Sequence, residues 1–148
     1  SAANVASVPG NPDRMLFFGY MGSGSQVVSH VISTGVETNI SPAGLTTKIA
    51  NCLVSNPSDP NELIITVNTD FDLLYSANLG TAWSTLYASL TFNATGLAVK
   101  WDELARVFVG GKPALVQLLY SPNEGSFFSN LAGAALGAVA NITNIEIT

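Results

Sequence analysis

Charged residues are scarce in this chain of 148 residues. Asp, Glu, Lys and Arg together make up 10% of it, against about 25% in an average soluble domain. Ten acidic and five basic residues give a net charge of -5. Nucleic acids are bound by clustered Lys and Arg, and the basic residues here are scattered singly along the sequence. We therefore expect no nucleic-acid partner.

Cysteine is almost absent. Cys52 is the one cysteine, so an internal disulfide is excluded and the hydrophobic core must carry the stability. A catalytic thiol needs a histidine partner, and His30 is the one histidine. The sequence also lacks a Gly-x-Ser-x-Gly elbow, a phosphate-binding loop with lysine and a His-x-x-x-His pair. We predict that the protein is not an enzyme and has no catalytic residues.

Long hydrophobic runs are missing as well. The apolar segment at residues 131–140 is half as long as the roughly twenty residues that a transmembrane helix needs, so we expect no membrane insertion. Residues 1–10 lack the features of a signal peptide and predict a linker. Because the chain opens on small residues without Met, we expect a fragment of a longer protein. Residues 11–148 are expected to form a single β-sandwich domain.

What the sequence does contain is a series of short runs rich in β-branched and aromatic residues, separated by turn residues. These runs predict strands at residues 14–20, 26–34, 46–54, 62–67, 82–92, 113–120 and 142–147. Residues 101–109 predict one short helix, with acidic residues near its start. No internal repeat is evident. The predicted fold is an all-β antiparallel β-sandwich of two sheets, jelly-roll-like, with one or two short helices.

The most regular alternation lies at residues 82–92. It predicts a strand with Trp83 and Tyr87 side by side on the face opposite the core. Exposed aromatic rings of this kind stack against sugars or bury themselves in a subunit contact. Trp83 and Tyr87 are therefore the predicted ligand-binding or interface residues.

Two carboxylates form the one candidate metal site. Asp70 and Asp72 are two residues apart in an extended segment, so their side chains share a face. Carboxylate oxygens are the ligands that calcium prefers. The alternative is that both are solvated turn residues. Calcium at Asp70 and Asp72 is the one cofactor that the sequence suggests, and no other cofactor is expected.

The strands rich in Ser, Thr, Asn and Ala, the Pro- and Asn-containing loop at residues 55–61 and the ending at residues 141–148 resemble capsid domains of small non-enveloped RNA viruses. Shell-forming subunits of that class usually carry a basic arm, which this chain lacks, so the resemblance implies a projecting domain. It further implies self-association as a dimer or trimer, attachment to a host receptor or glycan, and a location on the virion surface. A carbohydrate-binding or adhesin-type β-sandwich module, located extracellularly, is the alternative.

Overall fold

The computed structural model describes residues 3–22, 24–68, 72–88, 90, 93–101, 106–111, 117–121, 129–130 and 145. Within these ranges the chain is nearly all β-structure with antiparallel sheets, which confirms the predicted fold class. The one helical element in them is the 3-10 turn η1, Leu45–Thr47. None of the described residues forms a helix that is long and apolar enough to cross a membrane.

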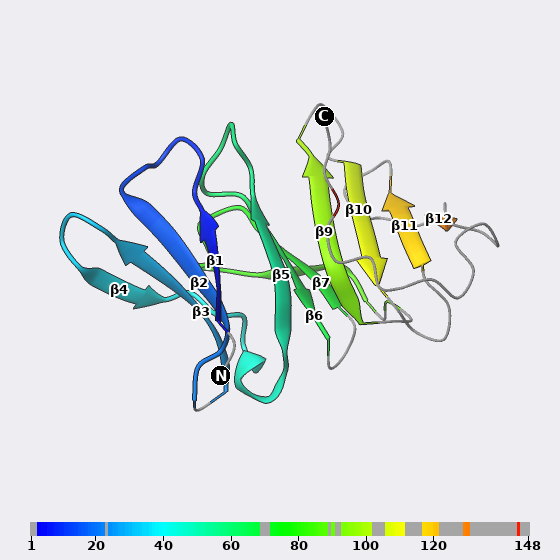
Figure 1. The fold of residues 1–148 in the computed structure, drawn as a ribbon, viewed down its shortest axis with the longest axis horizontal. Coiled ribbons are helices and arrows are strands. Elements are labelled where there is room, and N and C mark those ends of the chain that lie inside the picture. The colour runs from blue at the N-terminus through cyan, green and yellow to red at the C-terminus, as the bar shows by residue number, and fades with distance from the viewer. Residues whose placement is uncertain are drawn as a thin grey trace.

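The described strands form three four-stranded sheets, and in each sheet every strand pairs with the next one along the chain (Figure 1). Sheet A consists of β1 (Ala3–Ser7), β2 (Arg14–Tyr20), β3 (Ser25–Val31) and β4 (Val36–Asn39). Sheet B consists of β5 (Ala50–Ser55), β6 (Leu63–Val67), β7 (Asp72–Ser76) and β8 (Ser84–Tyr87). Sheet C consists of β9 (Ala94–Lys100), β10 (Arg106–Gly111), β11 (Gln117–Ser121) and β12 (Ser129–Asn130).

Sheet B is packed on both faces, so the molecule has three layers where the sequence predicts two. One face of sheet B meets sheet A in a core that includes Leu16 and Ile65. The other face meets sheet C in a core that includes Ile64 and Val107. Every residue of β6 is buried. A strand covered on both faces is apolar at consecutive positions instead of at alternate ones, and β6 has that pattern at every position except Thr66.

The three sheets repeat one plan along the chain. Their first strands begin at Ala3, Ala50 and Ala94, a repeat of about 45 residues. Strand β5 lies beside β1 on one side and β9 on the other, and the Asn51 side-chain amide donates a hydrogen bond to the Ala94 carbonyl at 2.9 Å. Four-stranded meanders stacked in this way resemble successive blades of a β-propeller. The expectation that the chain has no internal repeat is wrong.

Two predictions about local structure are also wrong. Residues 3–7, inside the predicted linker, form strand β1, which pairs with β2 along its whole length. Residues 106–109, inside the predicted helix, belong to strand β10. There Val107 and Val109 are fully buried against sheet B while Phe108 points to the other face. This burial favours the extended chain over the helix. The strand predicted at residues 142–147 lies outside the described residues apart from Ile145.

An irregularity in β8 changes the face to which Tyr87 points relative to Trp83, the residue just before the strand. The pairing of β7 with β8 shifts between Leu73 and Leu74, so β8 carries one residue more than β7 over the same length. An extra residue in a strand moves every following side chain to the opposite face. Trp83 therefore packs on the core between sheets A and B, and Tyr87 packs on the core between sheets B and C. The prediction that Trp83 and Tyr87 share one face is wrong.

Candidate ligand-binding site

The turn between β7 and β8 fixes the backbone that leads to Trp83. The Ser76 hydroxyl oxygen accepts a hydrogen bond from the backbone N–H of Gly80 at 2.8 Å. The Asn78 side-chain oxygen accepts one from the backbone N–H of Ala82, also at 2.8 Å, and a second from the Ser76 hydroxyl at 3.0 Å. Ser and Asn side chains that bind neighbouring backbone groups stabilise turns. The side chains of Ser76 and Asn78 thus stabilise the conformation of the turn.

The same turn is fastened to sheet A through Ile40, the residue that follows β4. The indole N–H of Trp83 donates a hydrogen bond to the Ile40 carbonyl at 2.8 Å. Gly80 has φ 78°, and a Cβ at this position would lie 2.7 Å from the Ile40 Cβ. Only glycine meets both conditions, because it tolerates positive φ and leaves room for the neighbour. Trp83 is consequently fixed where sheets A and B meet.

A hollow of about 200 Å³ opens beside Trp83. Its walls come from four places in the chain: the segment after β4, the end of η1, the last residue of β6 with the start of β7, and the start of β8. The lining includes Pro42, Lys48, Asp72, Trp83, Ser84 and Thr85. Sites for drug-sized molecules measure roughly 300–1,000 Å³. The hollow therefore fits a ligand no larger than a single ring.

The polar groups of this hollow favour a neutral ligand. Lys48 contributes a positive charge and Asp72 a negative one, and both side chains are half-buried. An ammonium group donates hydrogen bonds and a carboxylate accepts them, so a hydroxyl group suits either. An anion would meet the carboxylate, and a divalent cation would meet the ammonium. Ser84 and Thr85, both exposed, add two hydroxyls at the rim.

The structure brings together two of the four site residues that the sequence predicts. Asp72 and Trp83 line the same hollow, whereas Tyr87 is not part of its lining. Asp70 lies outside the described residues, so a calcium site built from Asp70 and Asp72 stays a prediction. Among the residues that the structure describes, no group of three or more His, Cys, Asp or Glu is placed to hold a metal ion.

The residues with catalytic chemistry lie elsewhere. Cys52, on β5, is half-buried, and this burial raises the pKa of its thiol. Since the thiolate is the reactive form, Cys52 is a poor nucleophile at neutral pH. His30 is on β3 and lies against Glu37. Neither Cys52 nor His30 lines the hollow beside Trp83.

Sequence reasoning missed Lys48, Ser84 and Thr85, and it missed the turn that positions Trp83. A signal for the turn is present. The pattern Leu-Leu-Tyr-Ser-x-Asn-x-Gly occurs at residues 73–80 and again at residues 118–125, about 45 residues later. Both copies begin in the third strand of a sheet, β7 or β11. Because residues 122–128 lie outside the described residues, the second copy is compared in sequence only.

A second hollow, of about 340 Å³, lies near the second tryptophan of the chain. It is lined mainly by apolar residues, among them Pro9, Val54, Pro57, Leu97 and Trp101. It has no charged side chain in its described lining. It therefore offers a ligand few groups that could bind it in one orientation.

No protein-family model matches this chain, and no curated protein sequence is significantly similar to it. A fold by itself does not define a function, since one architecture serves many activities. The chemistry of the hollow beside Trp83 is the more specific indication of function.

Proposed function

We propose that this protein is a non-catalytic binding module that attaches to glycans by holding one neutral sugar ring in the hollow beside Trp83. The observation that carries the proposal is the meeting of an aromatic ring, a carboxylate and an ammonium group in one small hollow. A sugar ring has an apolar face of C–H bonds and a rim of hydroxyls. The Trp83 ring can stack against the apolar face of the sugar. Asp72 can accept hydrogen bonds from the sugar hydroxyls, and Lys48 can donate hydrogen bonds to them.

The fixed position of Trp83 supports the same function. Its indole N–H is already bonded to Ile40, so the ring does not have to be ordered when a ligand arrives. Ordering a flexible side chain on binding costs about 0.5–1.5 kcal/mol, and a prearranged ring avoids this loss. Because the hollow is small, we expect weak binding of each site, with dissociation constants in the millimolar range.

The location in which this binding would act is the one that the sequence predicts. On a virion surface, which the composition and the resemblance to capsid domains predict, the site would attach the particle to a host glycan receptor. In an extracellular adhesin-type module it would bind a glycan in the same way. Several weak sites on one assembly bind a multivalent surface far more tightly than one site does, so millimolar binding by each subunit suits either setting.

Saturation-transfer NMR with glucose, galactose, mannose and N-acetylglucosamine tests the proposal. We expect binding of at least one of these neutral sugars by the folded protein. Thr85→Arg fills the hollow with a long side chain and should weaken that binding at least about tenfold, equivalent to 1.4 kcal/mol. The matched control is Thr38→Arg, since Thr38 is also an exposed strand threonine but lies on β4, away from the hollow.

Two outcomes contradict the proposal. One is that none of the four sugars binds the unmodified protein. The other is that Thr85→Arg and Thr38→Arg bind the sugar equally well while both remain folded by circular dichroism.

A further inference from the structure

Sheet A carries apolar side chains on both faces. Leu16, Phe18 and Val27 point toward sheet B and belong to the shared core. Side chains of alternate residues point the other way, so Phe17 and Val28 belong to the opposite face. We call this second face, formed by Val5, Met15, Phe17, Val28, His30 and Glu37, the outer face of sheet A.

An apolar row crosses the outer face. Phe17 pairs with Val5 on one side and with Val28 on the other, so the three side chains lie in line across β1, β2 and β3. Val5 is 53% exposed, and Phe17 and Val28 are half-buried. The described part of the chain places no other sheet over this row, in contrast to both faces of sheet B.

The sequence of β2 indicates that something covers the outer face. Residues 15–18 read Met-Leu-Phe-Phe, an unbroken apolar run. Such runs are typical of strands that are buried on both faces, whereas strands with one wet face alternate. A similar run occurs in β6, where Leu63, Ile64 and Ile65 follow one another, and every residue of β6 is buried.

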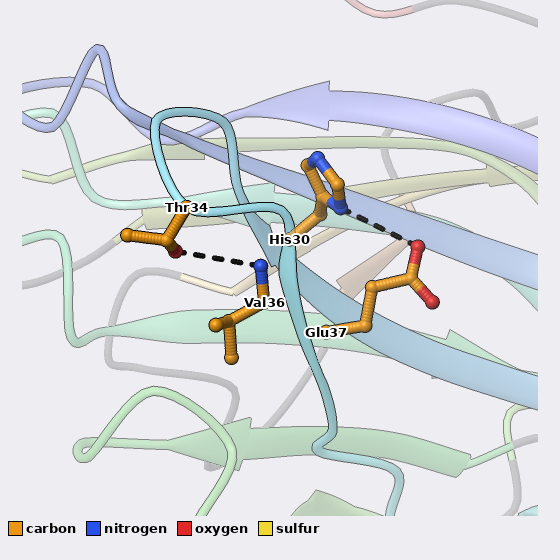
Figure 2. A network of polar contacts seen from close by, with 4 residues as sticks. All are labelled: His30, Thr34, Val36 and Glu37. Atoms are coloured by element: carbon orange, nitrogen blue, oxygen red, sulfur yellow. Dashed lines mark hydrogen bonds and ion pairs between the residues drawn. The ribbon is translucent and has the colours of Figure 1, made fainter.

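The polar side chains of the outer face suit a second copy of the same surface. His30 and Glu37 are paired residues of β3 and β4, and His30 Nδ1 lies 3.4 Å from a Glu37 carboxylate oxygen (Figure 2). The His30 ring also meets Phe17 edge-on, with ring centroids 6.1 Å apart. The acid and the base of this face thus lie together, beside the apolar row. Two copies that meet here bring no unmatched cluster of like charge together.

We infer that the outer face of sheet A binds the same face of a second copy of this chain, with the two sheets stacked face to face around a two-fold axis. The stacking is the same kind that joins sheets A and B and sheets B and C, and two-fold dimers are the most frequent protein assemblies. The inference does not rest on glycan binding, because the hollow beside Trp83 lies on the opposite side of sheet A, where it meets sheet B.

The area of the outer face determines how tightly the dimer is expected to form. Seven-residue strands and four strands per sheet give a face of at most roughly 23 Å by 19 Å, from about 3.3 Å per residue and about 4.8 Å per strand. A standard stable interface buries about 800 Å² on each partner. The outer face is below that size, so we expect a reversible dimer with a micromolar dissociation constant.

Sedimentation velocity over a concentration series up to roughly 100 µM, a range that populates micromolar dimers, tests the inference. We expect a concentration-dependent dimer of the unmodified protein. Val5→Lys places a charge at the exposed end of the apolar row, next to Phe17, and should weaken dimerisation at least about tenfold. Val36→Lys is the matched control, because Val36 is 54% exposed and lies on the other face of sheet A: it pairs with Val31, and Val31 pairs with Arg14, which has the parity of the core residue Leu16.

Three outcomes overturn the inference: the unmodified protein stays monomeric over the whole series, the two lysine variants weaken the dimer equally, or a larger oligomer forms and Val5→Lys leaves it intact. Thermal unfolding of both variants establishes that each is folded. Because both valines are exposed, neither substitution removes core packing.

Discussion

At the scale of single residues, Gly80 is the position where the site depends most on having no side chain. Its φ of 78° and its closeness to Ile40 both exclude a Cβ. We expect Gly80→Ala to lower the free energy of unfolding by more than about 1 kcal/mol, since alanine fits neither the backbone angle nor the space.

Gly35→Ala is the control for this change. Gly35 has a similar φ of 68°, but nothing lies within 4 Å of the Cβ that alanine would add. Gly35→Ala therefore measures the backbone strain alone, and Gly80→Ala adds the collision with Ile40. Urea unfolding of both variants checks this. Equal losses of stability would contradict the close docking of the turn on Ile40.

Asp13 links stability to pH. The Ser33 hydroxyl and then the Ser33 backbone N–H donate hydrogen bonds to its carboxylate, at 2.6 Å and 2.8 Å, and these bonds lower the pKa of Asp13 from its ordinary 3.8. A carboxyl whose pKa is lower in the folded state stabilises the fold above its ordinary pKa, and this contribution is lost as the pH falls through the folded pKa.

The Asp13 carboxylate should therefore stabilise the protein at neutral pH and less so in acid. The unmodified protein should melt at a higher temperature than Asp13→Asn at neutral pH, and the difference should shrink as the pH falls below 3.8. Thermal unfolding of both proteins over this pH range is the measurement. A difference that is constant with pH would show that the charge of Asp13 plays no part.

At the scale of elements, the turn between β7 and β8 is the device that holds the site together. Its Asn78 uses the side-chain oxygen to accept bonds from Ala82 and Ser76. We expect Asn78→Ala to lower the free energy of unfolding by about 1 kcal/mol, because the part-buried Ser76 hydroxyl and the exposed Ala82 N–H both lose their acceptor. Asn78→Asp keeps the accepting oxygen and should retain most of the stability.

Chemical denaturation of the two Asn78 variants distinguishes a hydrogen-bonding role from a steric one. If Asn78→Asp is as damaging as Asn78→Ala, the accepting oxygen is not what holds the turn. The sugar affinity of Asn78→Ala should fall as well, since Trp83 follows this turn directly.

Strand positions were largely predictable from the sequence. The expected strand at residues 14–20 coincides with β2, and the loop at residues 55–61 separates β5 from β6. These elements are predictable because apolar runs and turn residues are local signals. The helix expected at residues 101–109 was wrong because acidic residues near its start are a weak signal, and burial of Val107 and Val109 against sheet B outweighs it.

The candidate site was predictable in part. Asp72 was identified from its spacing of two residues from Asp70, and Trp83 from the alternation at residues 82–92. Their meeting with Lys48 depends on η1 and the stacking of sheets A and B, which no local pattern encodes. The pairing of Trp83 with Tyr87 failed for a similar reason: one extra residue in β8 reverses the side of the sheet, and strict alternation hides such a bulge.

At the scale of the whole molecule, the three stacked sheets account for the low content of charged residues. A chain that buries both faces of its central sheet needs apolar residues at positions where a two-layer sandwich has polar ones. The consecutive apolar residues 63–65 of β6 carried this information, and so did the repeated Leu-Leu-Tyr-Ser-x-Asn-x-Gly pattern. A strand buried on both faces, combined with a repeat of about 45 residues, indicates stacked four-stranded meanders.

In the function we propose, the hollow beside Trp83 holds a neutral sugar ring. The most direct test of this function is a two-dimensional proton–nitrogen NMR titration with each of the four neutral monosaccharides, followed at the indole N–H signals of the two tryptophans. With a sugar that binds, the Trp83 signal should move and saturate at millimolar concentrations while the Trp101 signal stays in place. If the Trp83 signal does not move with any of the four sugars, or if Trp101 moves in its place, the claim is contradicted.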